Sequence, residues 1–143
     1  MPFTESNYEN AILNLFTDVL GYSYAYGPDI DRDYHDPLYE ELLLSALQRI
    51  NPGLPMEALN EAVYKIKNFE TGTLLQKNMT FTDYMQSGVP VKYFVDGEER
   101  SALVYLIDFQ NPSNNDFTVV NQWTIVENSE KRPDVILFVN GLP

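Results

Sequence analysis

Residues 132–143 read RPDVILFVNGLP, and this stretch decides the fold. The pair Pro133-Asp134 opens a purely apolar run over residues 135–139, which has the length and composition of a buried strand. Asn140-Gly141 then ends the run with the strongest short signal for a type I′ hairpin turn. Since the chain ends two residues after Gly141, we expect the second strand of this hairpin to lie outside it.

Three further strands are predicted before this run, all after Gly88 and Pro90. The first covers residues 91–95 and turns at Asp96-Gly97. The second, residues 102–109, is apolar on both faces, so we expect it at the centre of the sheet. The third covers residues 117–126 and is long and mixed in character.

The first half of the chain has helical periodicity. We expect helices at about residues 6–20, 37–50, 55–68 and, as a short element, 81–86, with a loop over residues 22–36. Ser6 and Glu9 have the spacing of a capping box for the first helix. One buried face of that helix is predicted from the i, i+4, i+7, i+8, i+11 pattern, formed by Tyr8, Ile12, Leu15, Phe16 and Val19.

Helices first and strands last predict an α/β protein of α+β element order with a mixed sheet, incomplete at its C-terminus. The length of 143 residues fits a single domain, 1–143. We place its helical part at about residues 1–88 and its sheet part at residues 89–143.

Composition excludes several classes of function. No apolar run approaches the roughly 18 residues needed to span a membrane, and no secretory signal is visible, so we expect a cytoplasmic protein without a membrane partner. The absence of cysteine excludes a thiolate metal site, and the absence of a P-loop motif excludes ATP binding of that kind. A net charge of −12 argues against tight nucleic-acid binding by this chain alone.

Asp134 is the main candidate site residue. A carboxylate at the mouth of a buried strand is costly unless a positive group meets it, and a metal ion is the usual partner. Carboxylate oxygens suit Mg²⁺, which polarises a phosphate and activates water in phosphodiester hydrolysis. The alternative is an acid that simply ends a loop. A Pro-Asp pair alone is weak evidence for a metal site. The chain has a second pair, Pro28-Asp29, and the acidic stretch after it predicts a turn and not a buried strand.

Other acids are weaker candidates. Glu5 and Glu9 lie four residues apart beside the apolar stripe of the first helix, where either could point into a metal site. Spacing alone favours a capping role for Glu9 and a favourable N-terminal charge for Glu5. Asp108 closes an apolar stretch and could be a ligand or a turn acid. His35, the single histidine, is expected to be a solvated loop residue.

The run at residues 132–143 resembles the nuclease motif of the restriction (R) subunits of type I restriction-modification enzymes. The resemblance extends over nearly the whole chain, to TESNYE at 4–9, NPGLP at 51–55, residues 78–88, YLID at 105–108 and residues 115–122. It implies a restriction-endonuclease-like core of the PD-(D/E)xK superfamily, with Asp134 as the metal-binding acid. Glu9, or alternatively Glu5, matches a helix-borne acid of related nucleases.

The same resemblance implies several parts beyond Pro143. A paired Glu and a Lys are expected roughly 14 and 16 residues after Asp134, and an ATP-driven DNA translocase lies further downstream. The chain is therefore expected to be the N-terminal fragment of a Mg²⁺-dependent endonuclease, inactive by itself, with ATP bound only by the motor domains. The implied partners are double-stranded DNA and the methyltransferase and specificity subunits of a type I complex.

A second interpretation belongs to another class of function. The acidic balance could serve a non-catalytic interaction domain, such as a DNA mimic that occupies a basic groove. A mimic would align carboxylates along one surface at phosphate-like spacing. Here the acids are scattered, and many of them are explained by helix caps and turns, which favours the nuclease interpretation.

Overall fold

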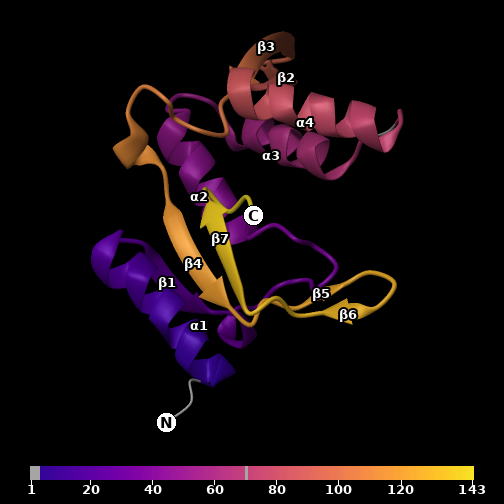
Figure 1. Cartoon of the computed structure of the whole chain (residues 1–143). Coiled ribbons are helices and arrows are strands. Elements are labelled where there is room, and N and C mark those ends of the chain that lie inside the picture. The colour runs from indigo at the N-terminus through magenta and orange to yellow at the C-terminus, as the bar shows by residue number, and fades with distance from the viewer. Residues whose placement is uncertain (1–3, 70) are drawn as a thin grey trace. The chain divides into compact units, whose positions relative to one another are not determined.

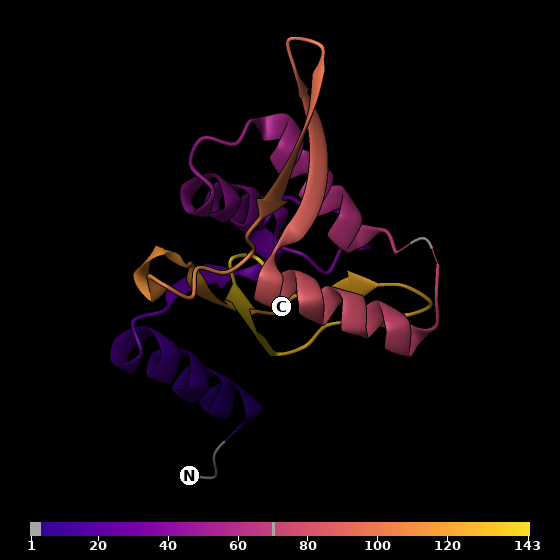
Figure 2. The same ribbon diagram turned by 90° about the horizontal axis from the view of Figure 1, so that it is seen from above.

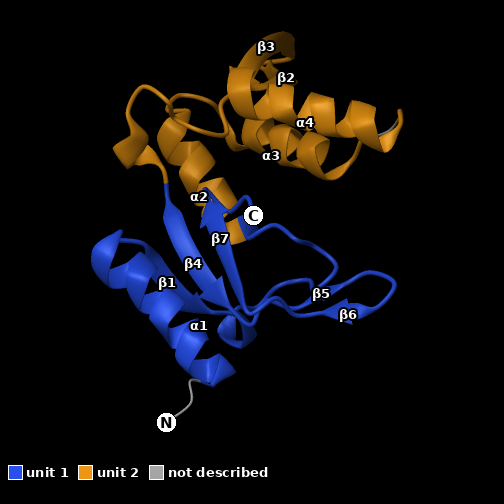
Figure 3. Cartoon of the chain, viewed as in Figure 1, with its two compact units in different colours: residues 1–40, 116–143 blue, residues 41–115 orange. Residues whose placement is uncertain are grey.

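The computed structural model describes residues 4–69 and 71–143. The chain divides into two compact units (Figure 3). Unit 1 consists of residues 1–40 and 116–143, and unit 2 consists of residues 41–115. The first helix and the last strands thus belong to one unit, although more than 70 residues separate them in the sequence.

A three-stranded mixed sheet forms the centre of unit 1 (Figure 1). Its order is β1 (Ser23–Tyr26), β4 (Phe117–Asn121) and β7 (Val135–Val139). β4 lies in the middle, parallel to β1 and antiparallel to β7, in a register that pairs Asn121 with Val135. The mixed sheet and the α+β class are confirmed, and so is the strand predicted from the apolar run before Asn140-Gly141.

The turn at Asn140-Gly141 is also confirmed. Both residues have positive φ, 53° and 77°, as a type I′ turn requires. Val139 and Leu142 exchange two backbone hydrogen bonds of 2.9 Å across it. Asn140 is fully buried, and its Oδ1 accepts a hydrogen bond of 2.6 Å from the backbone N–H of Asp116, which anchors the turn to the start of β4.

Aromatic side chains fill the core of unit 1. Val120, Trp123 and Phe138 are fully buried, and Tyr39 packs against the rings of Trp123 and Phe138 at 5.6 and 5.8 Å between centroids. Short elements complete the unit: α1 (Glu5–Asn14), the π-helical turn η1 (Leu15–Val19), the 3₁₀ turn η2 (Gly27–Asp29), β5 (Ile125–Val126) and β6 (Glu130–Lys131). β5 and β6 form a hairpin of their own.

The predicted buried face of the first helix is wrong. Tyr8 is 61% exposed and Val19 is 72% exposed, and Ile12 and Leu15 are also exposed. Leu13 is buried instead, with Glu9 and Phe16 half-buried on the same side. The reason is partly geometric: η1 has i→i+5 hydrogen bonds, such as that from Leu20 N to Leu15 O at 3.1 Å, so the 3.6-residue period does not continue through it.

The predicted capping box is wrong as well. The helix begins two residues earlier than Ser6 would set it, because Thr4 and Asn7 cap each other. The N–H of Asn7 donates to Thr4 Oγ1 at 3.3 Å, and the N–H of Thr4 donates to Asn7 Oδ1 at 3.0 Å. Glu9 is thereby released from the capping role that its spacing suggested, whereas Glu5 lies in the first turn, where a negative charge is favourable.

Three predictions about the strands are wrong. Residues 22–36, predicted as a loop, contain β1, because the four-residue segment SYAY pairs with β4 at a sheet edge without any long apolar run. The stretch 102–109 is not a central strand. Only its first three residues belong to a strand, β3 (Glu98–Val104), which pairs with β2 (Val89–Val95) in a separate hairpin. The predicted strand 117–126 is divided, with β4 ending at Asn121 and β5 following.

Asp108 lies after the end of β3 and forms a turn with the residues that follow it. Its carboxylate accepts hydrogen bonds from the backbone N–H groups of Gln110 and Asn111, at 3.1 and 2.9 Å, and from Asn114 Nδ2 at 3.0 Å. The Asn111 bond, followed by the Asn114 bond, lowers the pKa of Asp108 below its ordinary value. Asp108 is therefore a turn-forming acid that organises residues 108–114.

Unit 2 contains α2 (Glu40–Ile50), whose first residue is assigned to unit 1. It also contains α3 (Met56–Lys67), α4 (Leu74–Ser87), the β2–β3 hairpin and the 3₁₀ turn η3 (Pro112–Asn114). Figure 2 shows the hairpin as a long twisted ribbon that projects beyond the helices of this unit. The helices predicted at 37–50 and 55–68 and the turn at Asp96-Gly97 are confirmed. The fourth helix is longer than predicted, because Thr73 and Gln76 form a capping box well before Phe81.

Buried polar contacts also hold unit 2 together. Asn51 is 6% exposed and binds the backbone of Tyr105, donating from Nδ2 to its carbonyl at 2.9 Å and accepting from its N–H at 2.8 Å.

Within the described ranges, no helix has the length and apolar character to cross a membrane.

Candidate functional site

Asp134 lies directly before β7, at the end of the sheet where β4 finishes (Figure 1). Its side chain is exposed, whereas its backbone carbonyl accepts a hydrogen bond of 3.0 Å from the N–H of Gln122. Pro133 cannot continue a ladder because it has no N–H, so β7 starts after Asp134 and leaves the carboxylate at the mouth of the strand. The position is the one that the sequence predicted.

Glu9 reaches the same end of the sheet from α1. Its carboxylate accepts hydrogen bonds from Asn121 Nδ2 at 3.0 Å and from Gln122 Nε2 at 3.2 and 3.3 Å. The side chain is half-buried. Two amide donors therefore fix the carboxylate where an unsupported acid would be free to turn to solvent.

Gln122 connects the two acids. Its side chain donates to Glu9, and its backbone N–H donates to the carbonyl of Asp134. Gln122 has φ of +57°, a left-handed conformation that is uncommon for a residue other than glycine and often marks a functional position. The helix-borne acid and the strand-borne acid are thus held by one residue at the end of β4.

Two more residues support this corner. Tyr24 of β1 donates from its hydroxyl to Asn121 Oδ1 at 2.8 Å, which orients the amide toward Glu9. Gly27 lies so close to β4 that a Cβ atom placed on it would be 2.7 Å from the carbonyl oxygen of Asn121 and nearer still to that of Gln122. A side chain at position 27 would therefore push apart the strand ends that carry the site.

The other acids do not join this arrangement. Glu5 is exposed in the first turn of α1, and in the described part of the chain no hydrogen bond joins it to Asn121 or Gln122. Asp108 belongs to unit 2 and serves its own turn. His35 is exposed beside Asp33, with Nδ1 3.0 Å from Oδ1, as expected for a loop histidine. Pro28-Asp29 lies in η2, a turn, as predicted.

Sequence reasoning missed the amides. Asn121 and Gln122 directly follow the buried residues Thr118, Val119 and Val120, and polar side chains at the end of a buried strand are a signal that could have drawn attention to them. Their role depends on α1 facing β4 with Glu9, and the incorrect helical face concealed that contact.

The oxygen donors at this corner suit Mg²⁺ in kind. Mg²⁺ prefers oxygen ligands, is commonly held by one or two carboxylates and keeps several waters. In residues 4–69 and 71–143, no group of three or more His, Cys, Asp or Glu side chains is placed to hold an ion. The carboxylates of Asp134 and Glu9 are thus ligands of the kind that Mg²⁺ takes, but within the described residues they do not belong to a closed set of such ligands.

Comparison with known proteins connects this geometry to a family. A family model described as type I restriction enzyme R protein N terminus matches residues 2–143. The type I restriction enzyme HindI endonuclease subunit of Haemophilus influenzae is 35% identical over 134 residues, covering 87% of this chain. A protein of Methanocaldococcus jannaschii, provisionally named the type I restriction enzyme MjaIXP endonuclease subunit, is 30% identical over 145 residues, covering 94% of this chain. The chain spans 13% and 14% of the lengths of these relatives.

Proposed function

The chain belongs to the family of type I restriction enzyme R protein N termini, and we propose that it forms the first part of a DNA endonuclease site in a longer subunit. The observation that carries this proposal is the shared attachment of Glu9 and Asp134 to Gln122 at the end of β4. The family match covers residues 2–143 and does not by itself bring these two acids together.

In the proposed site, Asp134 and Glu9 supply the carboxylates that would hold Mg²⁺. The chemistry that Mg²⁺ supplies when bound is polarisation of a phosphate oxygen and a lower pKa for bound water. Asn121 and Gln122 keep the Glu9 carboxylate turned toward the strand end, and the backbone bond from Gln122 fixes where the Asp134 segment leaves the sheet. These contacts fix the Glu9 carboxylate and the backbone of Asp134 before any ligand arrives, and preorganisation of this kind favours an effective site.

The resemblance to type I R subunits implies a further Glu and a Lys for the same site. We propose that these residues come from the longer subunit, together with an ATP-driven translocase. Because the described residues place no third acid at the corner, we expect DNA cleavage from the longer subunit and not from these 143 residues alone. Methyltransferase and specificity subunits are the proposed partners that select the DNA site.

The proposal predicts a strict requirement for a divalent ion. Chelation of divalent ions should abolish cleavage of duplex DNA by the longer subunit in its complex, and added Mg²⁺ should restore it, because the carboxylate pair acts through an ion. The measurement is the rate of product formation from a plasmid in three parallel reactions: untreated, chelated, and chelated with Mg²⁺ returned. Cleavage that continues at an unchanged rate in chelator would refute a magnesium-dependent site here.

A further inference from the structure

Unit 1 has very few cations that could meet a DNA phosphate. It holds twelve of the 21 acidic residues but three of the nine basic residues, Arg32, Lys131 and Arg132. Affinity for nucleic acid comes mainly from Lys and Arg contacts to phosphate. If the site at β4 and β7 acts on DNA, these three residues are the cations that unit 1 can offer.

Arg32 is already occupied. Its guanidinium donates to the backbone carbonyls of Asp33, at 3.3 Å, of Asp36, at 3.2 Å, and of Thr124. It also lies over the indole ring of Trp123, 3.5 Å from the ring centroid. These contacts bind Arg32 to the core of unit 1, so it is a structural residue and not a free cation at the surface.

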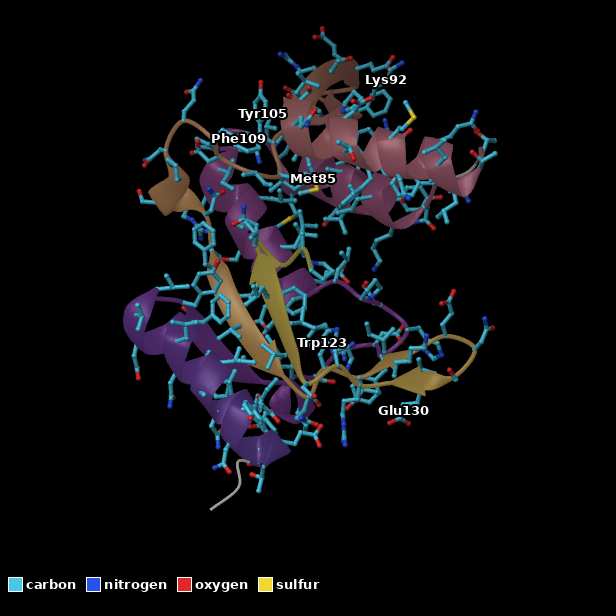
Figure 4. The ribbon with its side chains drawn as sticks, viewed as in Figure 1. Met85, Lys92, Tyr105, Phe109, Trp123 and Glu130 are labelled. Carbon is cyan, nitrogen blue, oxygen red and sulfur yellow. The ribbon has the colours of Figure 1, made fainter. Side chains whose placement is uncertain are left out.

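Lys131 and Arg132 differ from Arg32 in their exposure and in their contacts. Both side chains are exposed, and within the described ranges neither takes part in an ion pair, although Glu127 and Glu130 lie on the same hairpin. Lys131 ends β6, and Arg132 follows it two residues before Asp134. The β5–β6 hairpin, whose Glu130 is labelled in Figure 4, extends outward from the end of the sheet that carries the candidate site.

The local backbone favours two separate contacts. Pro133 restricts Arg132 to an extended conformation. Neighbouring side chains of an extended segment leave it on alternate sides, so we expect Lys131 and Arg132 to reach separate points. Two long cationic side chains that reach separate points can each contact a different phosphate of a duplex backbone.

From these observations we propose that Lys131 and Arg132 bind backbone phosphates of double-stranded DNA beside Asp134. The inference rests on the proposed function for its ligand, and it adds the residues by which this acidic unit would hold the duplex. Because the bonds are to phosphate, they give register and affinity without sequence preference. They place the backbone of the duplex next to Asp134.

The test is the salt dependence of duplex binding by the 143-residue chain. Affinity for a short fluorescent duplex is measured by anisotropy over a range of salt concentrations for the wild type and for the double variant Lys131→Ala/Arg132→Ala. The slope of log affinity against log salt is expected to become shallower by about 0.9 for each phosphate that the variant no longer neutralises. Circular dichroism checks that the variant remains folded.

A matched control removes the same charge elsewhere. Lys92 and Arg100 are an exposed Lys and Arg on the β2–β3 hairpin of unit 2, where they lie 3.3 Å from Glu99 and 3.9 Å from Glu98. The variant Lys92→Ala/Arg100→Ala changes the net charge equally, so long-range repulsion between the chain and DNA cancels in the comparison. Its slope is expected to remain that of the wild type.

Two results would overturn the phosphate assignment: no measurable binding of the duplex by the wild-type chain at low salt, or equal decreases in slope in the two double variants. The nuclease assignment fails in a different way. If the Lys131/Arg132 variant has the shallower slope expected of it but the longer subunit does not cleave DNA, the binding inference stands and the nuclease assignment does not.

Discussion

Replacement of Asp134 by alanine in the longer subunit is expected to slow DNA cleavage by at least about a thousandfold, while ATP hydrolysis by the same preparation continues. A carboxylate that holds a catalytic ion supports several kcal/mol of charge stabilisation in the transition state, and each factor of ten in rate corresponds to about 1.4 kcal/mol. The measurement is the rate of appearance of cut plasmid, with phosphate release from ATP recorded in parallel.

The structure indicates that this variant will fold. The Asp134 side chain is exposed, and the hydrogen bond that positions the segment is made by its backbone carbonyl, which alanine retains. Loss of cleavage can therefore be separated from loss of structure.

Asp29 provides a matched control, because it is the acid of the second Pro-Asp pair and is also exposed. Asp29→Ala should cleave DNA at the wild-type rate. Cleavage by Asp134→Ala at the wild-type rate would refute the assignment, and equal decreases in the two variants would show that the effect is not specific to the site.

Replacement of Trp123 by alanine is expected to destabilise the chain by about 3 to 5 kcal/mol, the usual cost of emptying a large aromatic site in a core. Trp123 is fully buried, its ring centroid lies 4.8 Å from that of Phe138, and Arg32 lies over its face. It also follows Gln122 directly, so its packing holds the end of β4 in place (Figure 4). The free energy of unfolding is measured by urea titration followed by circular dichroism.

Trp123→Phe is a second variant with which Trp123→Ala is compared. The indole Nε1 of Trp123 is buried without a hydrogen-bond partner in the described structure, so phenylalanine loses volume but no hydrogen bond. Its expected cost is about 1 to 2 kcal/mol, within the range of ordinary point changes. An alanine variant that is no less stable than the phenylalanine variant would contradict the packing described for unit 1.

Several elements of the fold could be predicted from sequence because their signals are local. The strand before Asn140-Gly141 has a continuous apolar run and a turn pair with positive φ, and the structure confirms both. The helices α2 and α3 follow the 3.6-residue period without interruption, and α2 buries Leu43, Ala46 and Leu47 at helical spacing.

The errors have a common cause, because most of them concerned interactions that no local pattern contains. The orientation of α1 is set by a bond between Glu9 and Asn121, which lie 112 positions apart, and helical periodicity does not reveal it. β1 is a strand because β4 pairs with it, and not because its four residues have a strong propensity. The stretch at residues 102–109 is apolar enough for a strand throughout, but β3 ends at Val104, where Asn51 binds the backbone of Tyr105.

The acids of the candidate site could be predicted from the sequence, but the residues that hold them could not be assigned that role. Asp134 could be selected from its position before an apolar run, and Glu9 from a family resemblance. The polar end of the strand could have drawn attention to Gln122, but its left-handed backbone and its two bonds to segments on either side of it are visible only in the tertiary structure. Local sequence identifies the acids, and the tertiary structure identifies what holds them.

The most direct test of the central claim, that Glu9 and Asp134 belong to one nuclease site, is DNA cleavage by the longer subunit carrying Glu9→Gln, compared with Glu5→Gln. Both variants remove one negative charge from the same helix, but Glu9 is the one held by Asn121 and Gln122. We expect Glu9→Gln to lose cleavage and Glu5→Gln to keep it, with ATP hydrolysis intact in both. Full cleavage by Glu9→Gln would show that Glu9 is not part of a nuclease site with Asp134.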